Sequence, residues 1–176
     1  LTERGYDLML RRVIPERDED WLDRFIGSGM IDGLLVIGQS DQFDRIEDAA
    51  DGYLPMVVWG NHAEGQRHCV VGTDNRLGGR LATERLIESG ARHIYFLGDT
   101  SAVEFAARYA GALDAAGRSG VTVTPLTSHL SSDRLEAEVA ANLDRSFERG
   151  DAIFAATDTL AIASLARLKA LGIAVP

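Results

Sequence analysis

The apolar residues of this chain alternate between two spacings along its length. Short runs of strand length occur at residues 33–38, 55–59, 93–97, 121–125 and 152–155. Between these runs, apolar residues recur at the spacing of helix faces, which predicts helices at residues 21–26, 43–50, 75–89, 101–116, 132–149 and 158–171. Short apolar strands that alternate with helices are typical of the α/β class, in which helices cover both faces of a parallel sheet.

The two ends of the sequence predict that it is a segment of a longer domain. Residues 1–5 have the pattern of a last helical turn that ends at a glycine, and residues 6–10 then predict a strand. The sequence closes just after a helix, where a further strand is expected. The break at residues 89–91 is the best boundary between two lobes, which we place at residues 1–91 and 92–176.

Acidic residues outnumber basic ones, with 27 Asp and Glu against 18 Lys and Arg and a formal net charge of −9. Binding to DNA draws much of its affinity from cationic side chains that displace counterions from phosphates. No basic run is present to supply this, so any DNA contact is expected to come from outside the segment. No run approaches the ~18 apolar residues of a membrane helix, and no secretory leader opens the sequence. We therefore expect a cytoplasmic protein with no membrane partner.

Polar side chains follow the predicted strands at the points where each strand ends. In a doubly wound sheet, ligands bind beyond the carboxyl ends of the strands. Asp74 and Asp158 lie at two such ends, each at the start of a predicted helix. A carboxylate there can cap the helix, bind a ligand or do both, so both interpretations stand. Thr100 and Ser101 favour the capping role, because Ser101 and Glu104 have the spacing of a capping box.

Arg108 is a second candidate for ligand binding. It lies within the helix predicted at residues 101–116, and Gly111 follows it closely. The glycine would allow close packing there, and the arginine could then direct its fork of N–H donors into a cleft. A solvated helix arginine is the competing interpretation, and it is favoured when the sequence is considered alone.

The sequence contains no catalytic grouping that we can identify. It lacks a Gly-x-Ser-x-Gly elbow and a phosphate-binding loop, and its four histidines show no metal-ligand spacing. We therefore expect a binding protein rather than an enzyme, with no metal and no cofactor. An enzyme that acts on a nucleotide or a sugar phosphate is the least favoured alternative.

The last predicted helix, at residues 158–171, carries apolar residues around much of its circumference. A helix that is apolar on both sides is usually buried on both sides. One side can pack on the sheet. The other would then need either a partner subunit or a further segment of the same protein.

Several blocks of the sequence resemble those of the LacI/GalR family of transcriptional regulators, and they occur in the same order. The most specific pair is DNRLGG at residues 74–79 and IESGARHI at residues 87–94. The other blocks are DGLLVIG (32–38), LPMVVWG (54–60), RYAG (108–111), AIFAATD (152–158) and LGIAVP (171–176).

This resemblance implies the fold of periplasmic sugar-binding proteins, with two doubly wound α/β lobes around a ligand cleft, here only in part. It implies that Asp74, Arg108, Thr157 and Asp158 contact a small, sugar-like effector, with Phe105 as a looser candidate for stacking on a ring. It also implies a homodimer and a DNA-binding headpiece, absent from this segment, that binds operator DNA. The chain would then be the effector-sensing core of a repressor-like regulator. A periplasmic sugar-binding protein of a transport system is the alternative.

Overall fold

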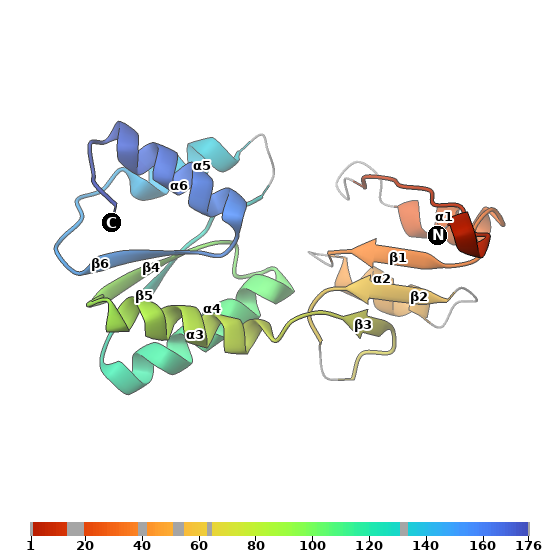
Figure 1. Cartoon of the computed structure of the whole chain (residues 1–176), viewed down its shortest axis with the longest axis horizontal. Helices are drawn as coiled ribbons and strands as arrows, with labels where there is room; N and C mark the ends of the chain where they lie inside the picture. The colour runs from red at the N-terminus through yellow and green to blue at the C-terminus, as the bar shows by residue number, and fades with distance from the viewer. Residues whose placement is uncertain are drawn as a thin grey trace.

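The computed structural model describes residues 2–13, 20–38, 42–50, 55–62, 65–130 and 134–175. These residues form two lobes, each built on a parallel sheet (Figure 1). The chain passes from the first lobe to the second where the last strand of the first sheet leads into a long helix. The two parallel sheets with their helices confirm the predicted α/β class.

The first lobe contains a sheet of three parallel strands in the order β1-β2-β3. Its elements are α1 (Trp21–Gly27), β1 (Leu34–Ile37), α2 (Phe43–Ala50), β2 (Met56–Trp59) and β3 (Cys69–Val71). Val36 and Val58 are paired across β1 and β2, so their side chains share one face of the sheet. They pack there with Trp21 and Leu22 of α1 and Ile46 of α2, and this cluster is the core of the lobe.

The second lobe contains three parallel strands in the order β5-β4-β6. Its elements are α3 (Asn75–Glu88), β4 (His93–Leu97), α4 (Val103–Ser119), β5 (Thr122–Leu126), α5 (Leu135–Leu143), β6 (Asp151–Ala155) and α6 (Asp158–Ala170). Helices α3 and α4 lie on one side of this sheet and α5 and α6 on the other (Figure 1). Phe96, Leu97, Val139, Leu143 and Leu160 belong to its core, which is separate from that of the first lobe.

Two helices of the second lobe touch through their backbones. A Cβ on Gly79 of α3 would overlap the carbonyl group of Arg108, and a Cβ on Gly111 of α4 would overlap that of Arg76. Only glycine permits such an approach, which is the close packing expected at Gly111. The guanidinium of Arg76 also pairs with Asp114, with Nε 2.7 Å from Oδ2. Helix α4 is therefore held firmly against α3.

Helix α3 packs on α4 and reaches β6, so it lies with the second sheet. The sequence-based boundary at residues 91 and 92 assigned this helix to the first lobe. The glycine and ion-pair contacts described above explain the difference, because they bind α3 to α4 although a strand separates them in sequence. We propose that the boundary lies instead at residues 72–74, between β3 and α3.

Three local expectations are wrong. Residues 6–10 form no strand after the 3-10 turn at Thr2–Arg4; they are irregular and make no ladder with β1, β2 or β3, and without such pairing a strand does not form. The helix expected at residues 132–149 is shorter, spanning Leu135–Leu143; residues 132 and 133 lie outside the described ranges. Ser101 does not cap α4, because the N-cap position is occupied by Ala102 and no side chain caps the helix there; the hydroxyl of Ser101 donates to Asp99, 2.7 Å away.

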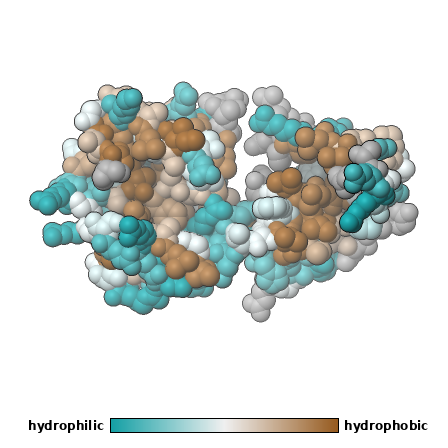
Figure 2. Space-filling view, viewed as in Figure 1, coloured by the Kyte–Doolittle hydropathy of each residue, from teal (hydrophilic) through white to brown (hydrophobic). Residues whose placement is uncertain are grey.

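One face of the first sheet has no covering helix among the described residues. Leu35 and Ile37 of β1, Trp59 of β2 and Val71 of β3 alternate with the core residues and are exposed. Figure 2 shows hydrophobic side chains gathered over this lobe. Parallel sheets are normally covered on both sides, and here the described residues cover one.

Candidate functional site

A cleft of about 630 Å³ lies between the two lobes, at the carboxyl ends of the strands. The first lobe contributes an apolar wall, in which Ile37 and Trp59 end β1 and β2 and Gly38 and Gly60 follow them. Trp59 is 59% exposed, so its indole ring is accessible to a ligand in the cleft. Ligands of doubly wound sheets bind at this end of the strands. The cleft is therefore the candidate ligand-binding site.

The second lobe contributes a polar wall to the same cleft. Asp99 and Ser101 follow β4, His129 follows β5, and Thr157 follows β6. Arg134 precedes α5 and lines the cleft as well. These carboxylate, hydroxyl, imidazole and guanidinium groups can hydrogen-bond the hydroxyls of a small ligand.

Three of the five predicted site residues line the cleft, namely Phe105, Arg108 and Thr157. Asp74 and Asp158 do not line it. The carboxylate of Asp74 accepts a hydrogen bond from the backbone N of Leu77 at 2.8 Å, so it caps α3. Asp158 is the exposed first residue of α6. The structure thus favours the capping interpretation for Asp74 and gives Asp158 no place in the cleft wall.

Thr157 both caps a helix and lines the cleft, which are the two roles that the sequence left open for Asp158. Its hydroxyl accepts a hydrogen bond from the backbone N of Leu160 at 3.4 Å, which caps α6. The same residue lines the cleft. A hydroxyl that accepts from the helix still has its own hydrogen to donate, and that hydrogen is available to a ligand.

Arg108 is held on the cleft wall by three contacts. Its Nε donates to Oδ1 of Asn75 at 2.8 Å, and its Nη1 donates to the backbone carbonyl of Ala156. Its guanidinium carbon lies 5.7 Å from the centre of the Phe105 ring, as in a cation–π contact. These hydrogen bonds use two of the guanidinium nitrogens, Nε and Nη1. Its remaining N–H groups make no hydrogen bond to the described residues, so they can bind a ligand.

Asn75 joins Arg108 to the first lobe, and sequence reasoning missed this role. Its side-chain amide donates to Oδ1 of Asn61 at 3.1 Å and to the backbone carbonyl of Thr73 at 3.4 Å. Asn75 is 5% exposed and lines the cleft. The strand-to-helix junction at which Asn75 begins α3 is the one local signal, and its partners Asn61 and Arg108 are distant in sequence.

Asp99 and His129 lie side by side in the polar wall. Oδ1 of Asp99 accepts from the backbone N and the hydroxyl of Ser101, and its Oδ2 lies 3.7 Å from Nε2 of His129. Burial favours the neutral acid, but these hydrogen bonds and the imidazole together lower the pKa of Asp99. The Nδ1 of His129 lies 3.0 Å from the carboxylate of Glu138. An ionised Asp99 beside a fixed imidazole therefore lines the cleft.

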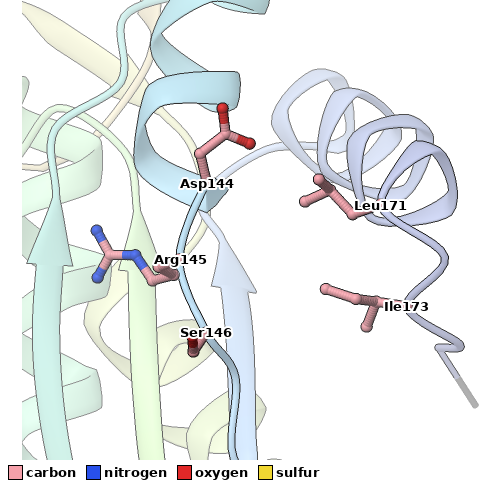
Figure 3. A pocket seen from close by; sticks show the side chains of 5 residues that line it. All are labelled: Asp144, Arg145, Ser146, Leu171 and Ile173. Carbon is pink, nitrogen blue, oxygen red and sulfur yellow. The ribbon is translucent and has the colours of Figure 1, made fainter.

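A second hollow, of about 430 Å³, lies away from this cleft at the ends of α5 and α6 (Figure 3). Leu171 and Ile173 line it opposite Asp144, Arg145 and Ser146. Its charged groups already have partners, because Asp144 pairs with Arg167 and Arg145 lies over the ring of Tyr95. This hollow lies before β6 and not at the carboxyl ends of the strands, where ligands of doubly wound sheets bind.

Neither a metal centre nor a membrane helix emerges from the described ranges. No cluster of three or more His, Cys, Asp and Glu there could hold a metal ion. No helix in the same part of the chain is long and apolar enough to cross a membrane.

Comparison with known proteins agrees with this architecture. The family model for the periplasmic binding protein-like domain matches residues 83–176, which is just over half of the chain. The HTH-type transcriptional regulator CelR of Thermobifida fusca is 30% identical over 184 residues, covering 100% of this chain and 53% of the relative. The chain thus spans about half the length of the curated relatives that it matches.

Solved structures show the same likeness. A LacI family transcriptional regulator from Mycobacterium smegmatis is 25% identical and superposes with a TM-score of 0.82, over 99% of this chain and 66% of that one. A LacI family regulator from Enterococcus faecium with bound ribose is 22% identical, with a TM-score of 0.78, over 99% and 64%. The two-lobed fold, the family match and the similarity to these relatives lead to one assignment. The chain belongs to the family of periplasmic binding protein-like domains, of the type that forms the effector-binding domain of LacI-family regulators.

Proposed function

We propose that this chain is the effector-sensing core of a DNA-binding transcriptional regulator and that its cleft binds a small, sugar-like ligand. The observation that carries the proposal is Arg108, which is fixed on the cleft wall with part of its fork still open. Thr157 adds a hydroxyl beside it, and Trp59 of the first lobe adds an exposed aromatic face, whereas Phe105 is buried against the guanidinium. Oriented donors next to an aromatic surface suit a ring that carries hydroxyl groups.

The two walls of the cleft support a ligand with two kinds of surface. The polar wall of the second lobe can bind hydroxyls, and Trp59 of the first lobe can cover the apolar face of a ring. The Enterococcus faecium neighbour has ribose bound. Asp74 and Asp158 enter the proposal as groups at helix N-termini beside the cleft, not as its main ligand contacts.

The mechanism that we propose is a shift in the relative arrangement of the lobes. A ligand that contacts both walls stabilises one arrangement, and it changes the equilibrium only by its preference for that arrangement. In a cytoplasmic homodimer, this shift would move two DNA-binding headpieces, which lie outside this segment, and so alter operator affinity. The reciprocal effect follows, because operator DNA would change ligand affinity by the same factor.

The test is calorimetry on the full-length protein with a defined panel of D-ribose, D-glucose, cellobiose, D-fructose 1-phosphate and hypoxanthine. We expect one member to bind and Arg108→Ala to weaken its affinity at least tenfold, since hydrogen bonds from a charged donor contribute about 1.5–3 kcal/mol. Arg145→Ala, which removes an arginine outside the cleft, is the matched control and should leave affinity unchanged. Equal affinity of wild type and Arg108→Ala would refute the site.

The same panel distinguishes the regulator from the transport-linked alternative. If the ligand changes the affinity of the full-length protein for its own promoter DNA, the regulator is supported. A full-length protein that binds the sugar but never binds DNA would favour the transport protein. The regulator names of the relatives support the first outcome.

A further inference from the structure

Asn75 occupies the junction between the lobes. It is the first residue of α3, directly after the residues that cross from the first lobe, and it is 5% exposed. Asn61, its partner, follows β2 of the first lobe, whereas Arg108 belongs to α4 of the second. The side chain of Asn75 therefore forms a hydrogen-bonded path from one lobe to the other.

The hydrogen bonds of this side chain require an amide. Its oxygen accepts from Nε of Arg108, while its nitrogen donates to Oδ1 of Asn61 and to the carbonyl of Thr73. An amide supplies both an acceptor and two N–H donors, and a carboxylate or an apolar side chain supplies at most one of these functions. Since a buried polar group is costly when unpaired, each of these partners depends on the amide of Asn75.

The bond to Asn75 also removes freedom from Arg108. An arginine side chain has many rotamers, and fixing it for a ligand costs conformational entropy. Here its backbone is fixed by the contact with Gly79, and its guanidinium is fixed by Asn75 and by the carbonyl of Ala156. The free part of the fork is thus oriented before a ligand arrives, which lowers the cost of binding.

We infer that Asn75 is a positioning residue that orients Arg108 for the ligand and transmits the state of Arg108 to the first lobe through Asn61. This inference rests on the proposed function, because Arg108 must contact the ligand for its orientation to matter. A movement of the lobes that displaces Asn61 changes the partners of Asn75, and through them the orientation of Arg108. Ligand affinity and lobe arrangement are then coupled through one amide.

A double-mutant cycle in the full-length protein tests the inference, using the panel member that binds wild type. With Arg108 unchanged, Asn75→Leu should weaken ligand binding about tenfold. It should change binding by less than about threefold in an Arg108→Lys background, because the lysine lacks the Nε that Asn75 holds. Asn75→Asp keeps an acceptor for Arg108 and should recover most of the affinity lost in Asn75→Leu. A merely structural defect would weaken both backgrounds equally and would not be relieved by aspartate.

A readout without ligand completes the test. In ¹⁵N-labelled wild-type protein, the Nε–H signal of Arg108 should be shifted and protected from exchange, and Asn75→Leu should remove this protection while Asn61→Ala should largely keep it. An unprotected signal in wild type, or equal loss of affinity in both arginine backgrounds, would overturn the role of Asn75 alone. No binding by any panel member, or no effect of Arg108→Ala, would instead overturn the proposed function and the inference with it.

Discussion

Glu138 stabilises the loop that carries His129 to the cleft. Its carboxylate accepts from the backbone N of His129 at 2.7 Å and lies 3.0 Å from the Nδ1 of the same residue. The backbone hydrogen bond is the main cause that lowers the pKa of Glu138 below its usual value, with burial acting against it and the imidazole adding to the lowering. The folded protein thus favours the ionised carboxylate.

This preference gives a pH dependence of stability with a definite sign. A carboxyl whose pKa is lowered on folding contributes stability above its unfolded pKa, near 4.5, and loses it as the pH falls through the lower folded pKa. We expect the free energy of unfolding, measured with urea, to decrease as the pH is lowered below about 4.5. The fall should be smaller in Glu138→Gln. Glu136→Gln, on the same helix, is the control, and an identical acid profile for all three proteins would contradict the role of Glu138.

Individual site residues were predictable mainly through the resemblance to a known family. That resemblance assigned Arg108, Phe105 and Thr157 to the cleft, whereas the sequence alone favoured a solvated arginine at position 108. At Asp74, by contrast, capping and ligand binding call for the same residue type at the same point, so only the direction of the carboxylate separates them. Asn75 and Trp59 depend on contacts between segments far apart in sequence, and local spacing contains no sign of these contacts.

At the scale of elements, the packing of α3 on α4 decides where Arg108 lies. Two glycines bring the helix backbones together, and the ion pair between Arg76 and Asp114 adds to the contact. The sequence predicted most of the strands and helices, because apolar periodicity is a local signal, although the strand expected at residues 6–10 does not form. It did not predict which sheet α3 would join, since that choice depends on the fit between two helix surfaces.

Two adjacent glycines allow a matched test of this packing. Gly79→Ala should lower the free energy of unfolding by about 1–3 kcal/mol, because its Cβ would overlap the carbonyl group of Arg108 and force the helices apart. A Cβ on Gly78 meets no atom within 4 Å. Gly78→Ala should therefore raise the free energy of unfolding by about 0.5–1 kcal/mol, since alanine favours the helix. Thermal and urea unfolding give both values. Equal effects at the two positions would show that α3 and α4 do not touch as described.

At the scale of the molecule, surfaces remain that the described residues do not cover. Helix α6 buries Leu160, Ser164 and Leu168 in its own lobe and exposes Ile162 and Leu165 on another side. This is the two-sided apolar pattern that the sequence predicted. What covers the second side depends on other chains or segments, and a single sequence contains no information on that geometry.

If this side of α6 is the dimer interface, a charge there should separate the subunits. We expect Leu165→Asp to shift the full-length protein toward monomers in sedimentation velocity, because burying an unpaired carboxylate is unfavourable. Leu113→Asp places the same charge on an exposed leucine of α4 and should leave the sedimentation coefficient unchanged. A dimer that persists in Leu165→Asp would place the interface elsewhere.

The two tryptophans of the chain occupy opposite environments. Trp21 is sealed in the core of the first lobe at 5% exposure, whereas Trp59 borders the cleft at 59%. Indole emission responds to the polarity around the ring, so native Trp59 is a built-in optical label for occupancy of the cleft. In a Trp21→Phe variant, the emission wavelength of Trp59 and its accessibility to a quencher would report directly on what enters between the lobes, without any attached dye.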